Sequence, residues 1–103
     1  MKKIRIKLKY DELNAVSNRI TFFIQNTNFK KPDTKMIMAL LMQFNMNQQK
    51  RLFLEFSKPV IVSFDIPTAC AFVIFCGWQH FDASKYEENV LIKINNQLQQ
   101  QLA

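Results

Sequence analysis

Basic and apolar residues alternate strictly near the start of the chain, over residues 3–10. The apolar positions are Ile4, Ile6, Leu8 and Tyr10, and the basic positions between them are Lys3, Arg5, Lys7 and Lys9. A period of two residues is typical of a half-buried β-strand, in which successive side chains point to opposite faces. The pattern therefore predicts a strand with one apolar face and one cationic face.

Helical spacing replaces this alternation in the next two segments. Asp11 and Glu12 suit the positive end of a helix dipole, so we expect a helix to start there. Its apolar stripe consists of Leu13, Val16, Ile20, Phe23 and Ile24. After a polar connection over residues 26–32, we expect Asp33 or Thr34 to cap a second helix. The second helix is apolar almost all round, at Met36, Met38, Leu40, Leu41, Met42, Phe44 and Met46, and its pattern fades over residues 45–50.

Residues 51–65 allow two interpretations. In one, the segment from Leu52 to Phe56 extends the second helix. In the other, it is a strand that turns at residues 57–59 into a further strand over residues 60–65. We favour this hairpin because a three-residue connection is a usual hairpin length. The segment is apolar on both faces, at Val60, Ile61, Val62 and Phe64, which predicts a central strand covered on both sides.

Two more helices are expected in the last third of the chain. Pro67 suits the first position of the third helix and Gly77 suits its C-terminal end. Residues 69–76 between them are an unbroken apolar run, which predicts the central buried helix of the domain. Asp82 or Ser84 would cap the fourth helix. The apolar stripe of that helix is Tyr86, Val90, Leu91, Ile94, Leu98 and Leu102.

The two halves of the chain share one order of elements. A shift of 56 residues places Ile4, Ile6 and Leu8 on Val60, Val62 and Phe64, so that each half reads strand, helix, helix. The alternative is that any two strand-to-helix units look alike at this level. We expect a single α+β domain over residues 1–103, with a small, mostly antiparallel sheet of two or three strands and four helices.

Composition narrows the chemistry that the chain can perform. It has a single glycine, whereas the P-loop and the dinucleotide fingerprint need several. One histidine and two cysteines are too few for a closed zinc site built of those residues alone. Mixed metal ligands would have to come from His80 and Asp82 with Glu87, Glu88 or Asp65, and any chain of this length offers such sets. We therefore expect no metal, no cofactor and no small-molecule substrate.

One pair of residues resembles a catalytic arrangement. Cys76 and His80 are four residues apart, which puts two side chains on one face of a helix, and a thiol beside an imidazole can act as a nucleophile. Gly77, however, is expected to end the helix between them, and no third orienting residue is evident. We expect a non-enzymatic protein with no catalytic residue and with no disulfide between Cys70 and Cys76, which lie on different helix faces.

The positive charge is concentrated in the first third of the chain. The formal net charge is +6, and residues 36–103 contain five basic and five acidic residues, which cancel. Such an excess favours an acidic partner: nucleic acid, an anionic membrane surface or an acidic protein. Solubility alone accounts for a net charge of ~2–8 in a small domain.

The sequence shows neither a secretory signal nor a membrane span. Alternating charge, not an apolar segment, follows the first lysines. The longest uncharged run, residues 66–81, contains polar residues and is shorter than the ~20 apolar residues that a span needs. We expect a cytoplasmic protein with no membrane association, in which the cysteines are reduced.

The two most apolar helices exceed what one small core can cover. Residues 36–46 and 69–76 carry apolar side chains in every direction around the helix, and Phe22 and Phe29 add to this apolar surface. Methionine-rich helices serve as core filling and also as adaptable binding surfaces. We therefore expect a homodimer or a complex with a partner protein.

The cationic face of the first strand is the strongest functional feature of the sequence. Its four cations alternate over about 20 Å, and neighbours are about 7 Å apart, close to the phosphate repeat of a nucleic-acid strand. We interpret the chain as a nucleic-acid-binding accessory or regulatory protein. The contacts expected are Lys3, Arg5, Lys7 and Lys9, with Lys30, Lys31 and Lys35 as secondary phosphate contacts. The alternatives are a strand guarded from aggregation by its charges and a protein–protein interaction module, either a self-associating subunit or an inhibitor, without a nucleic-acid role.

The segment from Lys3 to Ile20 resembles the ribbon-helix-helix DNA-binding proteins, in which an alternating strand leads into an acidic helix start and then a second helix. The resemblance implies that two such strands pair and that their polar face enters the major groove, read by the four cations of the strand. The chain departs from that family in its longer first helix and in the absence of a small-residue turn after it. The other strand would have to come from the second half, whose outward residues are Ile61, Ser63 and Asp65 and are not cationic.

Overall fold

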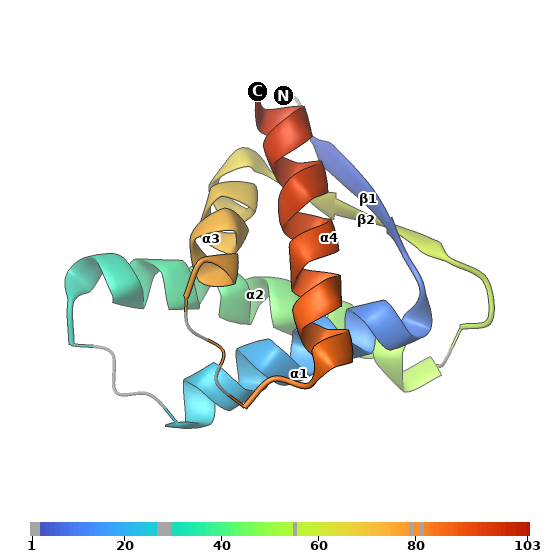
Figure 1. The fold of residues 1–103 in the computed structure, drawn as a ribbon, viewed down its shortest axis with the longest axis horizontal. Coiled ribbons are helices and arrows are strands. Elements are labelled where there is room, and N and C mark those ends of the chain that lie inside the picture. The colour runs from blue at the N-terminus through green and yellow to red at the C-terminus, as the bar shows by residue number, and fades with distance from the viewer. Residues whose placement is uncertain (1–2, 27–29, 55, 79, 81) are drawn as a thin grey trace.

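The chain folds as an α+β globule. The computed structural model describes residues 3–26, 30–54, 56–78, 80 and 82–103. Within these ranges the elements follow the order β1 (Ile4–Leu8), α1 (Tyr10–Asn26), α2 (Pro32–Leu54), β2 (Val60–Phe64), α3 (Ile66–Cys76) and α4 (Lys85–Leu102) (Figure 1). Four helices and a two-stranded antiparallel sheet confirm the expected fold class.

The two strands meet in a symmetric register. They pair antiparallel, and Ile6 lies opposite Val62 at the centre of the sheet. These two residues are also equivalent under the 56-residue shift, as are Tyr10 and Ile66, the first residues of α1 and α3. The helices follow the same symmetry, because α1 packs on α2 and α4 while α3 packs on α4 and α2. The chain is thus built of two strand–helix–helix halves, and the strand register is symmetric about the pair Ile6–Val62.

One face of the sheet joins the hydrophobic core. The inward side chains are Ile4, Ile6, Leu8, Val62 and Phe64, each at most 1% exposed. Phe64 stacks on Phe44 of α2, with ring centroids 5.0 Å apart, and Phe72 of α3 meets both rings edge-on at 4.9 and 5.3 Å. These three rings connect β2, α2 and α3, and such aromatic pairs add about 0.5–1.5 kcal/mol beyond the area they bury.

The hairpin expected over residues 51–65 is wrong. Helix α2 continues to Leu54, and β2 pairs with β1 rather than with residues 52–56. Leu52 is buried at helical spacing from Gln48, so packing against the core extends the helix through a segment that alternates like a strand. The expectation of a doubly covered β2 is also wrong, because Ile61 and Ser63 on its outer face are exposed.

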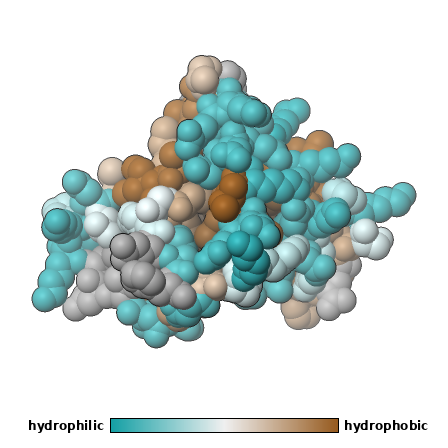
Figure 2. All heavy atoms as spheres, in the orientation of Figure 1, coloured by the Kyte–Doolittle hydropathy of each residue, from teal (hydrophilic) through white to brown (hydrophobic). Residues whose placement is uncertain are grey.

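Helix α3 is not the fully buried central helix that its sequence predicts. Ala69, Ala71, Phe72 and Phe75 face the core, while Ile66, Cys70 and Ile74 lie at the surface. Figure 2 shows apolar surface gathered over α3, beside the largely hydrophilic surface of α4. Only two helices, α2 and α4, pack closely against α3 among the described elements, so one face stays open.

Local capping signals set the starts of α3 and α4. Asp65 caps α3 by accepting a hydrogen bond from the Thr68 N–H at 2.8 Å. Ser84, one of the two expected candidates, caps α4 in a reciprocal capping box with Glu87. The expected cap of α2 is wrong, because that helix already begins at Pro32 and Asp33 lies inside its first turn. None of the helices in the described ranges is both long and apolar enough to cross a bilayer.

Candidate functional site

The outer face of β1 presents the four cations of the alternating segment. Lys3, Arg5, Lys7 and Lys9 are all exposed, while the residues between them are buried. This burial pattern confirms the two-faced strand, because the apolar residues that alternate with the cations are buried in the core. In the described part of the chain, none of the four side chains forms an ion pair. The cations are thus free to meet an anionic ligand.

The opposite strand contributes no cation to this face. Arg5 lies across from Ser63, and Lys7 lies across from Ile61. Asp65 follows β2, and its pKa is lowered first by the hydrogen bonds from Thr68 and then by the nearby charge of Lys3. The positive charge therefore runs along one strand of the ribbon, and the other strand is neutral with a single carboxylate just beyond its end.

A fifth cation, Lys93 of α4, lies beside β1 in an ion pair with Glu12. Its ammonium lies 2.6 Å from one carboxylate oxygen of Glu12. The other oxygen of that carboxylate accepts a hydrogen bond from the Lys9 N–H at 2.9 Å. Burial raises the pKa of Glu12, but these hydrogen bonds and the Lys93 charge outweigh it, so the pKa is lowered overall. A hollow of about 260 Å³ lies here, lined by Lys7, Lys9, Glu12, Pro59, Lys93 and Gln97. Sequence analysis missed Lys93 because only the fold brings it near the strand.

The secondary cations lie elsewhere. Lys30 and Lys31 directly precede α2 and Lys35 is in its first turn; all three are exposed. Figure 1 shows the start of α2 at one end of the molecule and the two strands at the other. The seven cations singled out in the sequence therefore form two separate groups.

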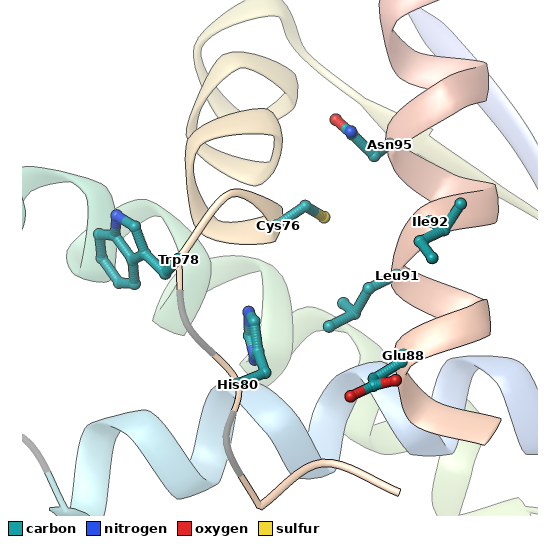
Figure 3. Close-up of a pocket in the computed structure, with 7 residues that line it drawn as sticks. All are labelled: Cys76, Trp78, His80, Glu88, Leu91, Ile92 and Asn95. Carbon is teal, nitrogen blue, oxygen red and sulfur yellow. The ribbon is translucent and has the colours of Figure 1, made fainter. Parts of the chain in front are cut away.

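Cys76 and His80 line one pocket without forming a nucleophile pair. The pocket, of about 230 Å³, lies between the end of α3 and α4 and is lined by Cys76, Trp78, His80, Glu88, Leu91, Ile92 and Asn95 (Figure 3). Burial raises the pKa of the Cys76 thiol to about 12, so the thiolate is strongly disfavoured at neutral pH. Among the described residues no hydrogen bond joins Cys76 to His80.

The imidazole of His80 is instead engaged with α1 and α3. Its Nε2 lies 3.0 Å from the carbonyl oxygen of Phe75, and its Nδ1 lies 3.3–3.4 Å from the Nη2 and Nε of Arg19. A carbonyl can only accept and a guanidinium can only donate, so this environment selects the neutral imidazole with its proton on Nε2. Burial lowers the pKa of His80, the Phe75 carbonyl opposes this, and the charge of Arg19 lowers it further.

Arg19 is a buried cation, which sequence analysis did not identify. It is 4% exposed, and its guanidinium carbon lies 4.9 Å from the ring centroid of Phe22 and 5.7 Å from that of Phe23. Within the described ranges no carboxylate pairs with it. The two rings and the His80 ring nitrogen supply its electrostatic environment, since aromatic faces attract cations. This cluster ties the connection before α4 to α1.

Metal-binding geometry is absent from the described part of the chain, where no three His, Cys, Asp or Glu side chains are grouped to hold an ion. The two cysteines are both free, as expected from their spacing. No protein-family model, curated protein or solved structure matches this chain.

Proposed function

We propose that this chain is a non-enzymatic nucleic-acid-binding module that lays the cationic face of β1 against a phosphate backbone. The observation that carries the proposal is the row formed by Lys3, Arg5, Lys7 and Lys9, all exposed on one face of a rigid, half-buried strand. A strand rise of about 3.3 Å puts neighbouring cations about 7 Å apart. Phosphate contacts of this kind provide affinity that depends little on base sequence.

The surroundings of the row support a phosphate contact rather than a buried ion-pair network. The hollow beside Lys7 and Lys9 opens toward α4, where Lys93 is paired with Glu12. Glu12 is already neutralised by Lys93, so it does not cancel the strand cations. Lys30, Lys31 and Lys35 lie at the other end of the molecule, so in this proposal they do not touch the same short stretch of backbone.

The ribbon offers two chemically different halves to a ligand. The β1 half is cationic, whereas Ile61 and Ser63 of β2 are neutral and exposed. Only the cations of β1 can neutralise phosphates, so in this proposal they follow the backbone of one nucleic-acid strand. The resemblance to ribbon-helix-helix proteins implies a paired ribbon, and in this chain both strands of the ribbon come from one polypeptide.

The test is a salt series on fluorescently labelled duplex and single-stranded probes of mixed sequence. Four phosphate contacts predict a log–log slope of roughly −3 to −4, from about −0.9 per contact on a duplex or −0.7 on a single strand. Lys7→Ala should weaken binding to all sequences alike and reduce the slope by about one contact. The matched control is Lys50→Ala, an exposed lysine on α2 that should leave both unchanged.

Two results would overturn the proposal. One is the absence of binding by the wild-type chain even at low salt. The other is an equal effect of Lys7→Ala and Lys50→Ala, which would show nonspecific attraction to the whole molecule. Both variants should remain folded, because exposed substitutions usually change stability by less than ~0.5 kcal/mol.

A further inference from the structure

The outer face of α2 exposes more large apolar side chains than any other described element. Met36, Met42 and Met46 are 62%, 43% and 65% exposed, and Phe53 is 87% exposed. The opposite face of the same helix is in the core through Met38, Leu41, Phe44 and Leu52. These side chains are therefore not left over from an incompletely packed core, and they form a second surface.

The spacing of this surface is that of a helix-packing seam. Ala39, Met42, Met46 and Phe53 recur at intervals of three, four and seven residues. Gln49 fills the remaining step, and its amide donates to the Ser17 hydroxyl of α1. Residues at such intervals share one helix face and match the core positions of a two-helix interface. We call these five residues the α2 seam. Its length from Ala39 to Phe53 is about 21 Å at 1.5 Å per residue.

The α2 seam is bordered by positive charge. Lys35 lies one turn before it on the same face, and Lys50 lies beside its second half, so the two ammonium groups mark its ends about 22 Å apart along the axis. Asp33, the carboxylate of this helix among the described residues, lies two residues before Lys35 and roughly 160° around the axis from it, on the side away from the seam. Among the described residues of α2, an occupant of the seam thus meets lysines and no carboxylate.

A second copy of the chain fits this charge pattern poorly. In an antiparallel pair that sets Met42 against Met46 of the other copy, each Lys35 lies within one turn of the other Lys50. In a parallel pair each lysine faces its own counterpart. Both arrangements bring like charges together at the two ends of an apolar contact, which is destabilising.

We propose that the α2 seam docks an acidic amphipathic helix of a partner protein. The partner would place apolar side chains on Met42, Met46 and Phe53 and a carboxylate near each of Lys35 and Lys50. Methionine suits this task, because its unbranched, polarizable side chain adapts to different partner side chains. The surface lies on α2 and does not use the cations of β1, so the inference stands independently of nucleic-acid binding.

The test uses a synthetic helical peptide of about five turns, with leucines along one heptad seam and a glutamate near each end. A matched peptide carries lysine in place of each glutamate. We expect the acidic peptide to bind at least tenfold more tightly than the basic one, and Met46→Gln to reduce its affinity about tenfold. The double variant Lys35→Glu/Lys50→Glu should reverse the preference between the two peptides, and Lys7→Ala should leave it unchanged.

Several results would reject this docking mode. One is that the acidic peptide binds no more tightly than the basic peptide. Another is that binding of the acidic peptide survives Met46→Gln and disappears with Lys7→Ala, which would place the contact on β1. Light scattering that shows a wild-type dimer dissociated by Met46→Gln would assign the seam to a second copy. Circular dichroism confirms that each variant is folded before binding is compared.

Discussion

The side-chain amide of Gln101 closes the free edge of β1 at Arg5. Its oxygen accepts from the Arg5 N–H at 3.2 Å and its nitrogen donates to the Arg5 carbonyl at 2.9 Å. On the other strand, Arg51 donates to the Ile61 carbonyl at 3.0 Å. Arg5 and Ile61 are equivalent under the 56-residue shift, so a side chain from α4 and one from α2 occupy matching places on the two outer edges of the ribbon.

Gln101→Ala should destabilise the chain by about 1 kcal/mol, because a hydrogen bond contributes roughly 0.5–1.5 kcal/mol net and water can reach this edge. It should also increase self-association, since an uncovered strand edge can pair with another chain. Urea unfolding and light scattering measure the two effects. Gln100→Ala, an exposed neighbour, serves as the control; equal behaviour of the two variants would show that the edge contact contributes nothing.

Acidification should weaken the fold through His80. Its pKa is lowered in the folded state from 6.5, so the unfolded chain takes up a proton at a higher pH than the folded one. The contribution of His80 is complete above pH 6.5 and is lost as the pH falls toward the lowered folded pKa. Because the chain has one histidine, His80→Gln should remove this dependence between pH 7.5 and 5.5.

Proton NMR of the imidazole provides the direct check on the same group. A folded-state midpoint at or above 6.5 would contradict the burial of this imidazole beside the charge of Arg19. Urea unfolding at both pH values for the wild type and His80→Gln then separates this residue from the carboxylates.

The two thiols should react at different rates. Cys70 is exposed on α3, whereas the buried thiol of Cys76 has its pKa raised to about 12. An aromatic disulfide reagent at pH 8 should modify one thiol rapidly and the other only after unfolding. Cys70→Ser should abolish the rapid phase. Rapid modification of both thiols in the native wild type would be incompatible with the burial of Cys76.

Ser84→Ala should cost about 1 kcal/mol, within the ~0.5–2 kcal/mol range for loss of an N-cap. The Ser84 hydroxyl accepts from the Glu87 N–H at 3.1 Å, and the Glu87 carboxylate accepts from the Ser84 N–H at 2.9 Å. Ser84→Asp should retain most of the stability because aspartate is an equally good cap. Urea unfolding measures both, with the exposed Ser57→Ala as the control that should leave the unfolding free energy unchanged.

Features that depend on neighbours in sequence could be predicted. The alternation around Ile6 identified β1 and its cationic face, because one side of the strand is buried and the other is solvated. The Ser84 cap and the stripe through Val90 and Ile94 followed from local spacing in the same way. The assignment of residues 52–56 failed because leucine and phenylalanine at alternate positions fit both a strand and a helix, and only the packing of Leu52 against the core decides between them.

Features created by distant residues could not be predicted. Arg19 and His80 are 61 positions apart, and no local pattern connects a basic residue in one helix to an imidazole in a later connection. The ion pair of Lys93 with Glu12 beside β1 could not be predicted for the same reason. Strand β2 pairs with β1, from which two helices separate it in the sequence. Short-range rules instead favour a hairpin between β2 and residues 52–56, which are its neighbours in sequence.

The long separation of the two strands has a consequence for synthesis. Val60 is added about fifty residues after Leu8, which at roughly 5–20 residues per second means that β1 waits roughly 3 to 10 s for its ladder partner. During that time Ile4, Ile6 and Leu8 have no strand beside them. The interleaved lysines and arginine then act as gatekeepers on the ribosome-bound chain, because charges spaced through an apolar segment discourage pairing with other nascent chains.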